Sequence, residues 1–167
     1  LKALQDAGLR NLRLAFTATP TNAAHLSATC ELAARLGVQF TCAVVHSSEH
    51  YFHTYGPAQR PSLEELRRQF EIVMRRELAT FSPKRWARAY FMDGLYAFAS
   101  GRGRPLPCRA GRDYFFMDPA GNLFTCNAAP FGMGNLAERS FDDIWNSPEA
   151  DGARRRAAGC PHGCWMI

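Results

Sequence analysis

Four cysteines in the last third of the chain constrain its fold more than any other feature of the sequence. The chain has 167 residues and six cysteines, of which these four are Cys108, Cys126, Cys160 and Cys164. Six cysteines are too few for a small disulfide scaffold, and in an intracellular protein such a grouping indicates metal binding rather than disulfides. We therefore expect the last third to fold around a metal centre.

The spacing of these cysteines divides them into two pairs. Cys108 and Cys126 bracket a predicted β-hairpin with its turn at residues 118–122, where a proline presets the turn and a glycine supplies positive φ. A hairpin brings its ends together, so these two thiols can meet. Cys160 and Cys164 lie on one tight loop. Two pairs of thiolates suit either a tetrahedral zinc ion or an iron–sulfur cluster. The wide first pair favours a cluster mildly, because zinc ribbons usually use two tight Cys-x-x-Cys turns.

The sequence before this region has the pattern of an α/β protein. Strands are predicted at residues 12–19 and 38–45, and helices at residues 23–36, at 62–81 and from Pro83 onward. Alternating helices and strands with short connections predict parallel strands. A basic, glycine-containing linker at residues 101–105 marks the predicted boundary between two domains, residues 1–104 and 105–167.

Residue types also indicate local features of the fold. Thr21 and Asn22 are expected to form a turn and a helix cap, and Ser62 with Glu65 to form a capping box. Cys30 and Cys42 lie within helix and strand patterns and are interpreted as small buried apolar residues. The apolar side of the helix after Pro83 is expected to lie in the core; its main members are Trp86, Tyr90, Phe91, Leu95 and Phe98.

The formal net charge of +5 comes from local basic groups, including the arginine triplet at residues 154–156. We interpret these groups as solvated helix faces and loop ends; the alternative is an anionic partner. We find no nucleic-acid-binding motif and no apolar run near the ~20 residues of a membrane helix, so we expect neither a nucleic-acid nor a membrane partner, and a cytoplasmic location. The chain begins at Leu1, inside an apparent helix, and we interpret it as an excerpt of a longer protein.

The cysteine-rich region resembles the C-terminal SPASM/twitch extension of radical S-adenosylmethionine (radical SAM) enzymes. The resemblance depends on features that occur together and in order: Cys108 and Cys126 around Gly121, the step Gly134-Asn135-Leu136, the segment Phe141-Asp142-Asp143-Ile144-Trp145, and Cys160 with Cys164. Residues 1–50 resemble, with lower specificity, the last barrel units of the same enzymes.

The resemblance implies an α/β fold in which the C-terminal units of a partial (β/α)6 radical SAM barrel precede a small α+β SPASM/twitch domain with a β-hairpin. It implies an auxiliary [4Fe–4S] cluster that assists substrate binding or electron transfer. The implied cluster ligands are Cys108, Cys126, Cys160 and Cys164. The implied contacts to S-adenosylmethionine, at the polar carboxyl ends of the two predicted strands, are Thr17, Thr19, Ser47 and Glu49.

The resemblance also implies that the complete enzyme cleaves S-adenosylmethionine reductively to a 5′-deoxyadenosyl radical, as enzymes of this family do. The expected partners are an electron donor such as ferredoxin or flavodoxin and a small-molecule or peptide substrate. The Cys-x-x-x-Cys-x-x-Cys motif that binds the catalytic cluster of the family is absent from this sequence, so we do not expect the chain to be active alone. The alternative hypothesis is a non-catalytic four-cysteine module, holding zinc or an iron–sulfur cluster, that docks a peptide or protein partner.

Overall fold

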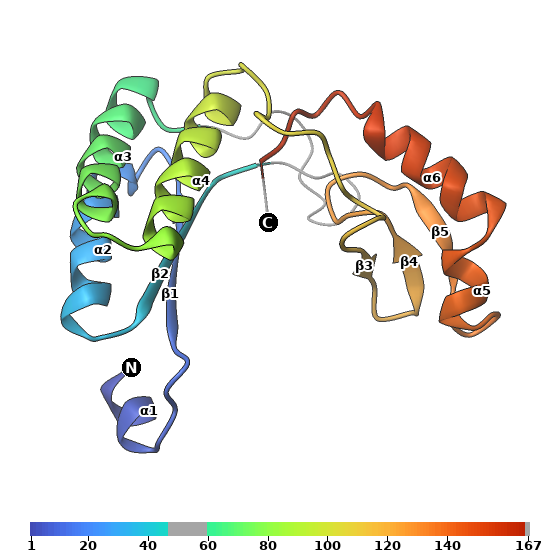
Figure 1. The fold of residues 1–167 in the computed structure, drawn as a ribbon, viewed down its shortest axis with the longest axis horizontal. Coiled ribbons are helices and arrows are strands. Elements are labelled where there is room, and N and C mark those ends of the chain that lie inside the picture. The colour runs from blue at the N-terminus through green and yellow to red at the C-terminus, as the bar shows by residue number, and fades with distance from the viewer. Residues whose placement is uncertain (47–59, 166–167) are drawn as a thin grey trace. The chain divides into compact units, whose positions relative to one another are not determined.

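The computed structural model describes residues 1–46 and 60–165 of the chain (Figure 1). These residues fold as two compact units. The first unit comprises residues 1–46, 60–104 and 164–165, and the second comprises Pro105–Gly163. Each unit has its own hydrophobic core, so each can be considered by itself.

The first unit contains a pair of parallel strands, β1 (Arg13–Ala18) and β2 (Gln39–Val44). They are joined through a short 3₁₀ helix, η1 (Ala23–His25), and α2 (Leu26–Arg35). The parallel pairing predicted from the sequence is therefore confirmed. The described residues contain one such βαβ unit, and the partial barrel implied by the resemblance stays a prediction.

Three further helices belong to this unit: α1 (Lys2–Asp6), α3 (Leu63–Leu78) and α4 (Pro83–Ala99). The core is formed by apolar side chains of α2, β2, α3 and α4, among them Leu26, Cys30, Phe40, Cys42, Leu66, Phe70, Met92 and Leu95. The predicted burial of Cys30 and Cys42 is thus confirmed. The expectation for the aromatic side of α4 is wrong at Trp86 and Tyr90, whose side chains are 38% and 48% exposed.

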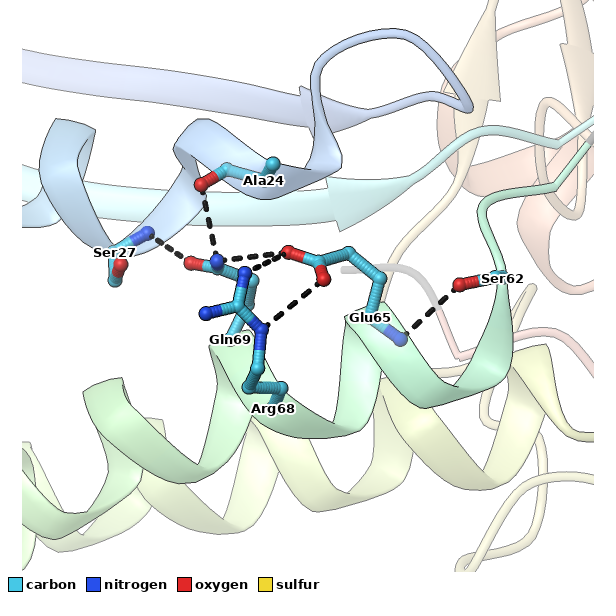
Figure 2. A network of polar contacts seen from close by, with 6 residues as sticks. All are labelled: Ala24, Ser27, Ser62, Glu65, Arg68 and Gln69. Carbon is cyan, nitrogen blue, oxygen red and sulfur yellow. Dashed lines mark hydrogen bonds and ion pairs between the residues drawn. The ribbon is translucent and has the colours of Figure 1, made fainter.

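The cap of α3 differs in part from the expected capping box. The Ser62 hydroxyl accepts a hydrogen bond from the Glu65 backbone N–H at 3.1 Å, as predicted. The Glu65 carboxylate does not complete the box; it accepts hydrogen bonds from Arg68 and Gln69 instead (Figure 2). The second half of the prediction is therefore wrong, because partners within the helix take up the carboxylate.

Gln69 connects α3 to the preceding elements, although it is a polar residue with only 2% of its surface exposed. Its side-chain oxygen accepts a hydrogen bond from Ser27 N at 2.9 Å, and its nitrogen donates to Ala24 O at 3.0 Å (Figure 2). A buried amide is stable when its donors and acceptor are paired, so Gln69 fixes α3 against the start of α2.

The second unit is built on a three-stranded antiparallel sheet of β3 (Phe116–Met117), β4 (Asn122–Phe124) and β5 (Gly132–Asn135). Two helices follow, α5 (Phe141–Trp145) and α6 (Pro148–Ala158), each capped by a serine hydroxyl. The core consists of Leu123, Met133, Ile144, Ala150 and Ala153. None of the helices in the described part of the chain has the length and apolar character needed to cross a membrane.

Candidate metal centre

The hairpin predicted between Cys108 and Cys126 is present and is formed by β3 and β4. Asp118 closes its turn: one carboxylate oxygen accepts the backbone N–H groups of Ala120 and Asn122, both at 2.9 Å, and the other accepts the Asn122 side chain at 2.8 Å. Gly121 has φ +82°, a conformation that glycine adopts without steric cost. The turn is therefore fixed by its own side chains.

The Gly134-Asn135 step of β5 stabilises the same turn through hydrogen bonds from the Asn135 side chain. The side-chain nitrogen of Asn135 donates to Ala120 O at 3.1 Å and to the side-chain oxygen of Asn122 at 2.8 Å. Gly134 has φ +154°, and a Cβ atom there would lie 3.1 Å from the side chain of Ile144. The Gly121 turn, the Gly134-Asn135 step and Ile144 thus lie together around the hairpin.

Arg154 is a structural residue that the sequence prediction missed, because it was grouped with a solvated arginine triplet. It is 8% exposed. Its Nε donates to Gly111 O at 2.6 Å and its Nη2 donates to Trp145 O at 2.7 Å. Its guanidinium carbon also lies 4.6 Å from the centre of the Trp145 ring.

Helical spacing carries the signal that distinguishes Arg154 from its neighbours. Ala150, Ala153 and Ala157 are buried on α6, and Arg154 lies four residues after the first and three before the last. Residues at these spacings share one face of a helix. Arg155 and Arg156 lie off this face and are exposed.

The four predicted ligands lie outside regular secondary structure. Cys108 precedes the hairpin, Cys126 follows β4, Cys160 follows the end of α6, and Cys164 packs against the core of the first unit. All four are half-buried, and none is joined in a disulfide.

The two remaining cysteines differ from these four in burial. Cys30 and Cys42 are 5% exposed. Burial raises the pKa of the Cys30 thiol, and it raises the pKa of Cys42 to about 12. Thiolates, not thiols, are the metal ligands and nucleophiles, so these two side chains behave as core residues.

The donor chemistry of the four half-buried cysteines fits an iron–sulfur cluster, because such clusters are held by cysteine thiolates. The structure does not bring the set together: within residues 1–46 and 60–165, no group of three or more His, Cys, Asp or Glu side chains is close enough to hold a metal ion. The assignment of these four ligands stays a prediction.

Trp165, the residue after Cys164, is anchored to α4 of the same unit. Trp165 is 7% exposed, and its indole Nε1 donates to Phe91 O at 2.9 Å. A Cβ atom on Gly94 would lie 2.3 Å from that nitrogen, so this glycine provides the space for the indole. The sequence signal was an isolated glycine within a helical pattern, which the sequence prediction did not use.

His162 contacts one of the predicted ligands. Its Nδ1 lies 3.2 Å from Cys160 Sγ. His162 is exposed, whereas Cys160 is half-buried.

The predicted contacts to S-adenosylmethionine are only partly covered by the structure. Thr17 ends the exposed side of β1, and Thr19 lies in the following turn. Ser47 and Glu49 lie outside the described residues. The assignments of Thr17, Thr19, Ser47 and Glu49 stay predictions.

Asn22 lies at the N-cap position of η1, and its side chain closes the turn after β1. Its side chain donates to Thr17 O at 3.0 Å and accepts from Thr19 N at 2.8 Å, and it makes no side-chain cap to η1. The predicted turn is therefore confirmed, whereas the Asn22 side chain makes no capping hydrogen bond, because the turn backbone takes both of its hydrogen bonds. His46 follows β2, and its burial lowers the pKa of its imidazole.

The comparisons with known proteins agree with the C-terminal part of this picture. Residues 108–165 match the family model of SPASM, an iron–sulfur cluster-binding domain. No curated protein and no solved structure matched the chain. The SPASM part of the resemblance is confirmed: residues 108–165 are similar to the SPASM family of iron–sulfur cluster-binding domains.

Proposed function

We propose that residues 108–165 bind an auxiliary [4Fe–4S] cluster and that the chain is part of a radical SAM enzyme. One observation carries the proposal. The four half-buried cysteines all fall within the segment that matches a cluster-binding family, with Cys108 at its first residue and Cys164 next to its last. The two cysteines outside that segment are core residues.

The proposed ligands are Cys108, Cys126, Cys160 and Cys164. When bound, the cluster would supply one-electron transfer or a binding point for substrate. The protein's part is to fix the backbone near the ligands. Arg154 does so for two of them, since it joins Gly111, three residues after Cys108, to α6, which ends two residues before Cys160.

The hairpin supports the position of the other ligand in the second unit. Cys126 follows β4 directly after Thr125, whose backbone N–H donates to Phe131 O at 3.1 Å. Thr125 is fully buried. The backbone before Cys126 is therefore held by the sheet, and the thiol itself is half-buried.

The radical SAM assignment is supported by the resemblance of the first part of the chain and by its parallel βαβ unit. In the complete enzyme, S-adenosylmethionine would bind at the carboxyl ends of the strands, where open α/β sheets bind ligands. Thr17, Thr19, Ser47 and Glu49 are the proposed contacts. The substrate would be a small molecule or a peptide, and ferredoxin or flavodoxin would supply electrons.

A series of cysteine variants tests the ligand assignment. Each of Cys108, Cys126, Cys160 and Cys164 is changed to Ala, and the chain is reconstituted without oxygen with iron and sulfide. We expect each variant to lose most of the visible absorption of the cluster and most of its iron.

Cys30→Ala is the matched control, because it removes a thiol from the core and leaves the matched segment unchanged. It should retain iron and colour like the unmodified chain. If the Cys108 and Cys126 variants also retain full iron and colour, the ligand assignment is wrong.

A further inference from the structure

We propose that His162 is a positioning residue that donates a hydrogen bond from Nδ1 to Cys160 Sγ and thereby raises the reduction potential of the cluster. The inference rests on the proposed function, because it requires Cys160 to be a cluster ligand. It adds a role for a side chain that is not itself a ligand.

The geometry of the pair carries the proposal. The 3.2 Å between Cys160 Sγ and His162 Nδ1 is short for a contact of sulfur with nitrogen and lies within the range of an N–H···S hydrogen bond. A ligating cysteine is a thiolate and has no proton to donate. The imidazole must therefore be the donor, with its proton on Nδ1.

The exposure of His162 indicates that its side chain does not serve to pack a core. His162 is exposed, so its ring fills no core position. The backbone before it is fixed, since Cys160 N donates to Ala157 O at 3.2 Å at the end of α6. The imidazole thus lies beside the thiol of a residue whose backbone N–H is hydrogen-bonded. Both residues are on a short loop that also contains Cys164.

The expected effect on the cluster follows from charge. Reduction adds one electron, so the reduced cluster carries more negative charge on its sulfur ligands than the oxidised cluster does. A hydrogen-bond donor at a ligand sulfur stabilises that charge and therefore favours the reduced state. Hydrogen bonds to the sulfurs are among the factors that set the potentials of such clusters.

Two substitutions at one position separate hydrogen bonding from other effects. His162→Leu removes the donor. His162→Asn keeps an N–H donor near the place of Nδ1. His25→Leu is the matched control, because His25 is also exposed but lies on η1, outside the matched segment.

The experiment uses the full chain, reconstituted with iron and sulfide, and measures iron and sulfide content and the reduction potential in an EPR-monitored titration. We expect His162→Leu to keep its iron and to show a more negative potential. His162→Asn should return towards the potential of the unmodified chain, and His25→Leu should not shift it.

Two results would overturn the inference. If His162→Leu loses its iron, His162 is a ligand rather than a hydrogen-bond donor. If it keeps its iron and its potential does not change, the contact has no effect on the cluster. Failure of the proposed function is recognised separately, since the unmodified chain would then bind no iron and sulfide, which would end both proposals.

Discussion

Gly94 of α4 leaves the space that the indole of Trp165 occupies. An alanine in a helix is normally more stable than a glycine by about 1 kcal/mol. At Gly94 the added Cβ would lie 2.3 Å from the indole of a buried tryptophan. We expect Gly94→Ala to destabilise the first unit by about 1–3 kcal/mol, measured as a lower midpoint of thermal unfolding.

Gly152 on α6 provides the control for this prediction. A Cβ there would lie 3.6 Å from its nearest neighbour, the end of the Arg156 side chain, which is an ordinary contact. Gly152→Ala should therefore stabilise the protein by up to about 1 kcal/mol. If Gly94→Ala also raises the midpoint, the indole does not occupy the position described here.

Thr125 contains a buried hydroxyl that finds no hydrogen-bond partner among the residues that the structure describes. Burying such a group costs about 1–3 kcal/mol, whereas an apolar group of the same shape avoids the cost. Valine has nearly the shape of threonine. We expect Thr125→Val to raise the free energy of unfolding by about 1 kcal/mol, measured by chemical denaturation. A destabilised valine variant would show that the hydroxyl has a partner in solution.

The burial of Cys42 predicts a difference in thiol reactivity. Because its pKa is raised to about 12, its reactive thiolate is scarce at any pH well below that value and increases only as the pH approaches it. Alkylation of the folded chain without cluster, at mildly alkaline pH, should spare Cys42 and modify Cys108, Cys126 and Cys160. Peptide mass spectrometry reads the result, and equal labelling of Cys42 in the folded chain would contradict its placement in the core.

At the scale of the elements, the Arg154 side chain links α6 to two other segments of the second unit. Arg154 donates to carbonyl groups of Gly111 and Trp145, which lie in two other segments of the second unit. Its removal leaves both carbonyls without this donor, and hydrogen bonds from charged groups contribute about 1.5–3 kcal/mol each. We expect Arg154→Ala to destabilise the second unit by about 3 kcal/mol, and to weaken retention of iron.

Arg155 is the matched control, since it is the next residue of the same helix and is exposed. Arg155→Ala should change the stability by no more than about 0.5 kcal/mol. Thermal unfolding of the two variants side by side makes the comparison. Equal effects would mean that the contacts of Arg154 contribute nothing specific.

The elements that the sequence predicted correctly depend on local patterns. The parallel strands alternate with a helix of clear periodicity, and the hairpin turn has its proline, glycine and aspartate within five residues, 118–122. Their chemistry acts over short distances along the chain, so the sequence alone was sufficient to predict them.

Gln69 and Arg154 have hydrogen-bond partners far along the chain, and the sequence did not predict these contacts. Gln69 bonds to residues 42 and 45 positions away, and Arg154 to a residue 43 positions away. The side chains of Asn22 and Glu65 bond instead to groups within five residues of them, and these groups are not the expected cap partners. Which of several nearby groups such a side chain bonds to depends on the folded structure, so residue type and spacing alone do not predict it.

At the scale of the whole molecule, the cysteines fall into two classes that correspond to position in the chain. Cys30 and Cys42 belong to a core, and the other four lie half-buried within residues 108–165. The sequence predicted this division from local context. It could not predict the contacts of Trp165 and His162 around the last pair, because these depend on how the chain folds after α6.

Metal analysis of the reconstituted chain is the direct test of the proposed iron–sulfur cluster of residues 108–165. Iron, acid-labile sulfide and zinc are measured per chain after anaerobic reconstitution and removal of unbound metal. We expect about four iron and four sulfide per chain, as a [4Fe–4S] cluster requires. The protein should also be brown. A colourless protein with one zinc ion and no sulfide would contradict this expectation.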